Sequence, residues 1–434
     1  MVGKSSGPWV RPGAPGSRTT KLELFYDLVF VFAFLNVTTL AAKDLTALTL
    51  LSSLVVLGLL WWCWTSFAYL GNLVRADYGI VPLIGFATMI GVLLLALTVP
   101  QAFVDAPGGL FGPAVFAFSY FFVRMLQVVA FWRIAGRAAS THPPPLLLLS
   151  APALVSFILI TIAAFAPQRL THGPGLELIR IALWSVALAV EYAAGAFITV
   201  TRWTLVSAGH LAERHALILL IALGESVLAL GLGPSIGPSL PITWPVVVAV
   251  VFGITVIAAL WWTHFDVLAP AVEQALHGTR DASRGRLVRD VYTYLHLPLV
   301  LGIILFSLGL KRLLSDISAP TVPAGRDTLN SAALYVLYGG VALYLVASIA
   351  VTLRTFRRLR PPKVAAAVLV IVLAPAADRI PALAALALLT AITLALVGLE
   401  LHTGREVRLR VRALEDGEQE ALEAAASRWR QHHL

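Results

Sequence analysis

The sequence is poor in cysteine and in charge. Cys63 is the only cysteine among 434 residues, which excludes a disulfide scaffold. Only 13% of the residues are charged, whereas a soluble domain carries about 25%. Together with 59% apolar residues, this shortage excludes both a chain of soluble domains and a disordered chain. The sequence therefore predicts an all-α, polytopic integral membrane protein.

Motifs of nucleotide and redox chemistry are also missing. The chain has no P-loop, GxGxxG, CxxC or GxSxG pattern, and no aspartate-rich DDxxD pattern for magnesium diphosphate. These absences disfavour ATP-driven transport and prenyl transfer. His210 and His215 are five residues apart, so they cannot share a helical face as the histidines of HExxH do. We therefore expect neither a metal nor a cofactor.

Twelve segments are apolar and long enough to be considered as membrane spans. They are approximately 25–42, 47–69, 79–99, 111–132, 146–166, 176–200, 214–232, 243–263, 291–310, 332–353, 364–377 and 381–400. The eleventh is short and ends near Pro375, so it could pair with the twelfth as a broken hairpin.

Lys and Arg indicate the orientation of these spans. If the N-terminus is cytoplasmic, three quarters of the 32 Lys and Arg residues fall in cytoplasmic segments, as the positive-inside rule requires. This bias predicts an even number of spans in the cell inner (cytoplasmic) membrane, with both termini in the cytoplasm. The net charge of +9 therefore indicates topology, and no nucleic-acid partner is expected.

Internal matches indicate a duplication. Trp61-Trp62 corresponds to Trp261-Trp262, and Asp27-Leu28-Val29-Phe30 corresponds to Glu225-Ser226-Val227-Leu228. We predict two parallel six-helix repeats, 23–205 and 206–400, with a pathway between them. Residues 1–22 lack the apolar core of a signal peptide and are expected to form a disordered cytoplasmic leader. Residues 401–434 are expected to form a charged, amphipathic tail. This tail lies on the inner leaflet, binds another chain, as in a homo-oligomer, or is a solvated helix.

Ionisable side chains within the spans mark the candidate site, because each costs at least ~2.5–3.5 kcal/mol to insert. Asp27, Glu191 and Glu225 are the carboxylates concerned, and Glu23 shares a helical face with Asp27. Their candidate partners are Arg124, Arg180, His210, Glu213, Arg214 and His215. These groups either form structural ion pairs, conduct protons or cations, or act as acids and bases on a lipophilic substrate.

Two sets of site residues follow from these interpretations. The predicted ion or substrate pathway comprises Glu23, Asp27, Arg124, Glu191, Arg214, His215, Glu225, Tyr292 and His296. An alternative acid–base site for a lipidic or isoprenoid substrate comprises His210, Glu213, His264 and Asp266. A non-catalytic membrane scaffold is the third alternative. We favour a transporter or channel for a small cation or proton-coupled solute over an enzyme.

Several segments resemble the signatures of the bacterial low temperature requirement A (LtrA) family. They are Glu23–Phe32, His210–Arg214, Ala222–Ser226, Leu260–Trp262 with Phe265-Asp266, and Tyr294–Gly302. The resemblance covers about residues 20–400. It implies a multi-span inner-membrane protein of a family named for a cold-growth phenotype, without an agreed substrate.

A more distant similarity concerns the first span. Residues 21–27, Lys-Leu-Glu-Leu-Phe-Tyr-Asp, are similar to the Arg-x-x-x-Phe-Ser-Asp opening helix of the endolysosomal potassium/proton channel family, which also has six-helix repeats. Lys21 replaces the Arg and Tyr26 the Ser, and Gly224-Glu225 in the second half lacks the Phe. The similarity implies a cation pathway only by analogy.

Overall fold

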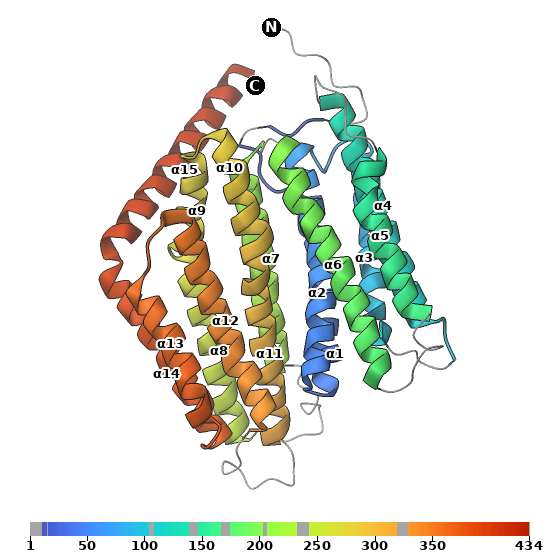
Figure 1. Cartoon of the computed structure of the whole chain (residues 1–434). Helices are drawn as coiled ribbons and strands as arrows, with labels where there is room; N and C mark the ends of the chain where they lie inside the picture. Colours follow the sequence, from blue (N-terminus) through green and yellow to red (C-terminus); the bar gives the residue numbers. More distant parts are fainter. Residues whose placement is uncertain are drawn as a thin grey trace.

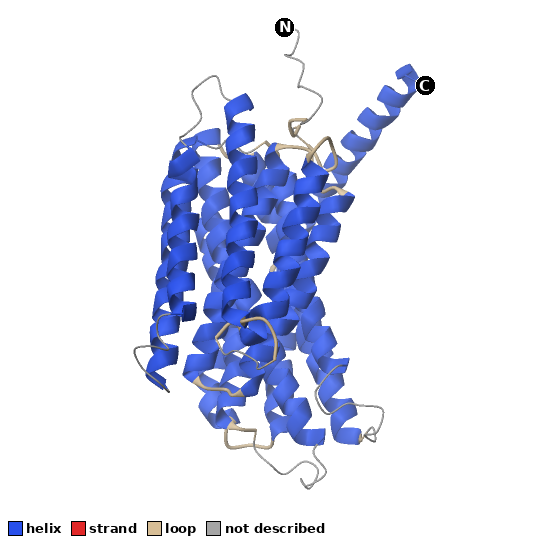
Figure 2. Ribbon diagram, turned by 90° about the vertical axis from the view of Figure 1, so that its right-hand side faces the viewer, coloured by secondary structure: helices blue, strands red, loops and turns tan. Residues whose placement is uncertain are grey.

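A computed structural model describes residues 11–14, 16–103, 108–138, 146–165, 174–202, 206–231, 243–318 and 329–433. These residues are almost entirely helical (Figures 1 and 2). Within this part of the chain, one isolated β-bridge joins Pro12 to Val74, and no β-sheet is formed. The all-α prediction is confirmed.

The first half of the chain forms six long helices. They are α1 (Lys21–Lys43), α2 (Ala47–Leu73), α3 (Val81–Thr98) with the 3-10 turn η1 (Val99–Gln101), α4 (Gly112–Ala138), α5 (Leu146–Phe165) and α6 (Pro174–Arg202).

The second half is longer because it contains extra short elements after its second helix. Its elements are α7 (Ala208–Gly231), α8 (Trp244–Phe265), α9 (Leu268–His277), α10 (Asp281–Val288), the π-helix η3 (Arg289–Leu295), α11 (His296–Ser318), α12 (Ser331–Phe356), α13 (Pro361–Ala377), α14 (Ala382–Thr403) and α15 (Arg405–His433).

Each of the twelve segments predicted from hydropathy coincides with a helix. Among the described residues, ten helical stretches are long and apolar enough to cross a membrane, and the shorter apolar stretches 149–165 and 361–377 accompany them. On α3, Leu83, Ile90 and Leu97 are seven residues apart and more than half exposed, which forms an apolar stripe suited to lipid. The chain is a multi-pass membrane protein.

The same order of neighbours recurs in the two halves. In the first half α1 packs on α2 and α3, the contacts continue from α3 through α4 and α5 to α6, and α6 returns to α2. In the second half α7 packs on α8 and α11, the contacts continue through α12 and α13 to α14, and α14 returns to α8.

Glycines allow the closest of these contacts, between α11 and α12. A Cβ on Gly302 would lie 2.7 Å from the carbonyl oxygen of Gly340, and one on Gly309 would lie 2.6 Å from the Cα of Leu337. The backbones of the two helices therefore touch, as small residues permit in membrane helix pairs.

Part of the predicted leader is ordered. The Gly13 amide donates to the Leu73 carbonyl, and the Arg75 amide donates to the Arg11 carbonyl. Thr20 and Glu23 form a capping box that begins α1. Residues 11–14 and 16–20 thus pack at the end of the bundle where α15 also ends (Figure 1), rather than forming the predicted disordered segment. We call this end of the bundle the terminal end.

Candidate functional site

Two carboxylates near the start of α1 pair with basic residues near the start of α7. Glu23 Oε1 lies 2.9 Å from His210 Nε2, and Asp27 Oδ1 lies 2.9 Å from Arg214 Nη2. The indole nitrogen of Trp64 on α2 also donates to Asp27, at 2.8 Å. All four ionisable side chains are at most 2% exposed. These carboxylates are therefore paired with two of the partners that the sequence suggested.

Glu225 has a partner that sequence reasoning missed. Lys311 of α11 donates to Glu225 Oε1 at 2.6 Å, and the hydroxyl of Thr38 on α1 donates to the same oxygen at 2.9 Å. The predicted ninth span ended at residue 310, which left Lys311 in an exported loop. Instead α11 continues to Ser318, so the lysine lies inside the bundle, where it is 8% exposed.

Arg180, a candidate partner of a carboxylate, contacts backbone oxygens instead. Its guanidinium donates to the carbonyls of Ala163, at 3.1 Å, and Phe103. Ala163 lies in the last turn of α5, where helical carbonyls lack partners within the helix, and Phe103 lies just beyond the end of η1. Arg180 therefore joins helix ends.

The contacts between α1 and α7 correct one detail of the predicted repeat. Glu23–His210, Asp27–Arg214 and Thr38–Glu225 all span 187 residues, so the helices run parallel and in register. Glu225 thus lies beside Thr38, about 16 Å deeper along the helix than Asp27, with which the sequence had matched it.

Buried apolar side chains separate the two polar levels on α1 and α7. Phe30 and Phe34 on α1 and Ile218 and Ala222 on α7 are all at most 1% exposed. The bundle thus has a polar level near the terminal end, an apolar layer, and a second polar level.

The third carboxylate, Glu191 of α6, belongs to a separate network. Arg124 of α4 donates to both of its oxygens, at 3.0 and 2.9 Å, in the bidentate geometry that suits guanidinium and carboxylate. Tyr120 and Trp62 each donate one further bond to Glu191, at 3.0 and 2.9 Å. Arg124 also donates to Ser66. This buried pair is therefore fully hydrogen-bonded.

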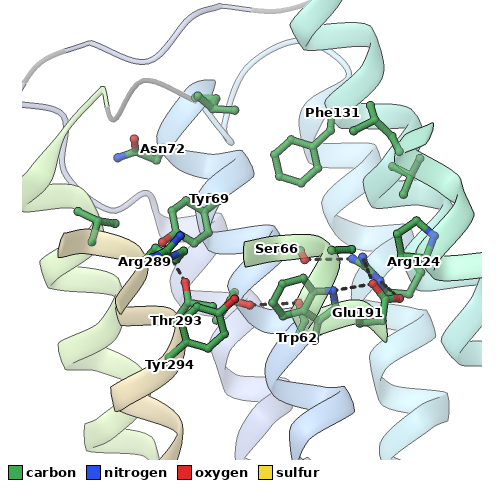
Figure 3. A pocket seen from close by; sticks show the side chains of 18 of the residues that line it. Trp62, Ser66, Tyr69, Asn72, Arg124, Phe131, Glu191, Arg289, Thr293 and Tyr294 are labelled. Atoms are coloured by element: carbon green, nitrogen blue, oxygen red, sulfur yellow. Dashed lines mark hydrogen bonds and ion pairs between the residues drawn. The ribbon is translucent and has the colours of Figure 1, made fainter. Parts of the chain in front are cut away.

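The Arg124–Glu191 pair lies at the wall of a cavity between helices of both halves (Figure 3), which we call the main cavity because it is more enclosed than the larger, open hollow that Asp27 borders on α1 and α7. The cavity has a volume of about 160 Å³, enough for roughly ten water molecules or a small solute. Its walls come from α2, α4, α5 and α6 of the first half and from α10 and η3 of the second. They are formed by Trp62, Thr65, Ser66, Tyr69, Asn72, Leu73, Arg124, Val128, Phe131, Leu149, Pro152, Glu191, Ala194, Gly195, Gly285, Val288, Arg289, Thr293 and Tyr294.

A close helix contact lies one turn beyond the cavity, on the side away from the terminal end. A Cβ on Gly58 of α2 would lie 2.7 Å from the Leu188 side chain of α6, so these helices touch one turn beyond Trp62. Gly195 lies against the Trp62 ring. A Cβ at Gly195 would therefore displace the Trp62 ring, whereas one at Gly58 would meet only the flexible end of Leu188.

A histidine cluster lies on the other side of η3. The imidazole centroid of His296 lies 5.2 Å from that of His215 and 5.7 Å from that of His264, and all three side chains are buried. The Tyr292 ring lies 4.5 Å from the His215 ring. His215, Tyr292 and His296 of the predicted pathway thus lie beside His264 of the alternative acid–base site.

The remaining predicted residues lie elsewhere. Asp266 pairs with Arg408 and Arg412 of α15, at 2.6 and 3.1 Å. Glu213 accepts the backbone amide of Thr19. Asp266 therefore anchors the C-terminal helix, and Glu213 anchors the segment before α1.

The predicted residues do not converge on one site in the described residues. Glu191 lines the main cavity. Asp27 pairs with Arg214 and borders an open hollow on α1 and α7. Glu225 lies at the deeper polar level. In the same part of the chain, no group of three or more His, Cys, Asp or Glu side chains could hold a metal ion. Four residues that the sequence did not suggest complete these networks: Trp62, Tyr120, Thr38 and Lys311. The one sequence signal for them is a polar atom within an otherwise apolar helix.

Comparison with known proteins gives a family. The model of the family described as bacterial low temperature requirement A protein (LtrA) matches residues 18–398. A protein of Rhizobium meliloti (strain 1021), described as uncharacterized, is 30% identical over 301 residues, which cover 66% of this chain and 67% of that protein. No solved structure matches the sequence.

Proposed function

This chain belongs to the bacterial low temperature requirement A family, and we propose that it is a transporter for a small, proton-coupled solute in the cytoplasmic membrane. The main cavity carries the proposal. It lies between the two halves of the chain, where solute sites of duplicated transporters are found.

The lining of the cavity suits a small solute with an apolar body and a polar group. Trp62, Tyr69, Phe131 and Tyr294 present aromatic surface to it (Figure 3). The hydroxyl of Ser66 accepts from Arg124, so its own hydrogen is available to a solute. A few placed polar groups on an apolar wall are typical of ligand pockets.

A carrier needs, besides a solute site, a closed barrier that can rearrange. The polar levels of α1, α7 and α11 and the apolar layer between them are suited to form it. Asp27–Arg214 joins α1 to α7, and Thr38 of α1 bonds to the Glu225–Lys311 pair of the second half, so both polar levels connect the halves on either side of the apolar layer. Buried pairs of this kind are weak in net stability, because desolvation offsets attraction. They therefore fix one arrangement of the halves without making it irreversible.

The rival functions receive less support from the geometry. A cation channel would need the carboxylates along one continuous path, whereas Asp27, Glu191 and Glu225 are each paired with a different cation. An enzyme using His210, Glu213, His264 and Asp266 would need them around one substrate. His210 is bonded to Glu23, and Asp266 to α15.

The proposal is tested by current measurements on proteoliposomes adsorbed to a solid-supported membrane. We would apply a panel of amino acids, organic acids, amines, sugars and potassium ions under a pH gradient. We expect at least one organic solute to give a current that depends on the gradient. Currents from potassium alone would support the channel, and no current from any compound would contradict both.

Cavity-filling variants make the same assay specific. Ala194→Trp and Gly195→Leu place bulk in the cavity or against Trp62 and should abolish the current. Leu83→Trp, on the exposed face of α3, is the matched control and should retain it. A current unchanged by both cavity variants would show that the solute passes elsewhere.

A further inference from the structure

The histidine cluster is a buried titratable group without an assigned role. It joins three helices of the second half, since His215 belongs to α7, His264 to α8 and His296 to α11. Each side chain is at most 3% exposed. Neutral histidines at such positions commonly fill space, so hydrogen bonding decides whether this cluster can do more.

The hydrogen bonds fix the tautomers of two of the rings. His215 Nδ1 lies 2.8 Å from the Leu211 carbonyl, and His296 Nδ1 lies 2.9 Å from the Val291 carbonyl. Because a carbonyl oxygen only accepts, both Nδ1 atoms carry the hydrogen and both Nε2 atoms carry a lone pair. His215 Nε2 has no hydrogen-bond partner among the described residues, nor does His264 Nδ1. The lone pair of His215 Nε2 is therefore open to a proton.

The neighbouring cations are each paired with a carboxylate. Arg214 beside His215 is paired with Asp27, and Lys363 on the His264 side lies 3.6 Å from Glu400. Beyond Tyr292, Glu273 of α9 lies 3.9 Å from His277.

The other neighbours of the cluster are neutral. Trp61 and Trp64 pack against the His215 ring, and Tyr69 lies near Tyr292. A single added proton would therefore change the net charge of this region. A second proton would place two cations on adjacent rings and is disfavoured.

The π-helix η3 connects the cluster to the cavity. The Val291 carbonyl accepts both the backbone amide and the ring of His296. Two residues later, Thr293 bonds to Trp61 through its carbonyl and to Tyr69 through its hydroxyl, and it lines the cavity. One irregular turn thus touches the cluster on one side and the cavity on the other. Short π-helical turns are often found at functional sites.

We propose that the His215–His296–His264 cluster binds one proton and thereby controls the position of η3 at the wall of the cavity. An imidazolium in the cluster would have no counter-ion in the present arrangement, and a buried unpaired charge is costly. Proton binding thus favours a displaced η3 and a more open cavity. The link to solute movement rests on the proposed function, whereas proton binding and the movement of η3 do not.

Proton binding is tested directly by nitrogen NMR of the full chain, labelled with ¹⁵N-histidine, in liposomes. At pH 8 we expect His215 and His296 as neutral Nδ1–H tautomers, assigned by the signals that His215→Gln and His296→Gln remove. On acidification to pH 4 the cluster should give one shared protonation step. The signals of the exposed His277 should be unaffected by these variants. Cluster signals that stay neutral and unchanged throughout would overturn the proposal.

The movement of η3 is tested by cysteine accessibility in a Cys63→Ala background. Gly285 of α10 lines the cavity close to η3 with open space at its Cα, and Ala194 lines it from α6. We would compare how fast a water-soluble methanethiosulfonate modifies Gly285→Cys and Ala194→Cys. The ratio of the two rates cancels the effect of pH on the thiol itself.

We expect acid to raise the Gly285→Cys rate severalfold relative to Ala194→Cys, and His296→Gln to remove this increase. A ratio that does not change with pH would overturn the control of η3, even if the cluster titrates. Neither experiment uses a solute, so a failed solute panel would count against the proposed function and not against this inference.

Discussion

At the scale of single residues, the buried charges are organised as pairs whose partners come from distant parts of the sequence. Glu225 and Lys311 are 86 residues apart, and Arg124 and Glu191 are 67 apart. Burial makes the loss of one partner costly, because the other remains charged in a dry interior. Replacing both by apolar residues is often neutral.

This asymmetry gives a prediction for Glu225–Lys311. Lys311→Met should destabilise the protein by about 3–5 kcal/mol, because it leaves Glu225 with Thr38 as its remaining bond. The double variant Lys311→Met with Glu225→Leu should recover most of that loss. Reversible unfolding with SDS in mixed micelles measures both free energies.

The control is the exposed pair Arg75–Asp77, in which both side chains are more than 40% exposed. Arg75→Met should change stability by no more than about 1 kcal/mol. A Lys311→Met protein as stable as the wild type would mean that Glu225 is not held as an anion by this lysine.

At the scale of helices, hydropathy was sufficient to place the spans, because each must bury its backbone in lipid and therefore needs a long apolar run. It could not place α9 and α10, which are short and lie between two spans, and it included most of η3 in the ninth span without indicating its irregular geometry. It also ended the ninth span before Lys311, because a buried lysine is indistinguishable by hydropathy from one at a membrane surface.

The internal match of Asp27 with Glu225 failed for a related reason. A carboxylate followed by Val within an apolar helix is too common a pattern to fix a register. The structure fixes it through contacts that sequence does not reveal, at a constant separation of 187 residues. The Trp61 and Trp261 match lies 200 residues apart, and the difference is consistent with the longer connection between α7 and α8.

The α11–α12 contact allows a test with adjacent glycines. A Cβ on Gly340 would collide with the α11 backbone at Gly302 and Phe306, whereas one on Gly339 would meet no atom within 4 Å. Gly340→Ala should therefore destabilise the protein by about 1–3 kcal/mol. Gly339→Ala should be neutral or slightly stabilising, because alanine favours helix. Equal unfolding free energies of the two variants would show that the helices are not in backbone contact.

At the scale of the molecule, α15 is attached to the bundle by a small number of contacts. Val411 packs with Val267 and Ala271, and Asp266 holds Arg408 and Arg412. Most of the rest of α15 is exposed, and the helix extends past the other helices at the terminal end (Figures 1 and 2). Asp266, considered as a catalytic group from sequence alone, is thus the main polar anchor of this helix.

Asp266→Asn should release α15. Asparagine cannot form the charge-assisted bonds to Arg408 and Arg412, so trypsin should cleave in residues 405–412 severalfold faster than in the wild type. Glu418→Gln, which alters an exposed bond to Gln274, is the control and should leave the rate unchanged. Equal cleavage of all three proteins would mean that apolar packing at Val411 alone holds the helix.

The distribution of Lys and Arg also predicts the orientation of the molecule in the membrane. Residues 16–20 and the C-terminal end of α15 lie at the same end of the bundle (Figure 1), and three quarters of the Lys and Arg residues fall in segments predicted to face the same side. Because cytoplasmic segments retain positive charge, this end should face the cytoplasm. A green fluorescent protein fused after Leu434 should therefore fluoresce, and alkaline phosphatase fused after Ser318, at the opposite end of α11, should be active. The reverse result would show that the molecule has the opposite orientation in the membrane. The main cavity would then face the outside, and the proposed proton site would respond to external pH.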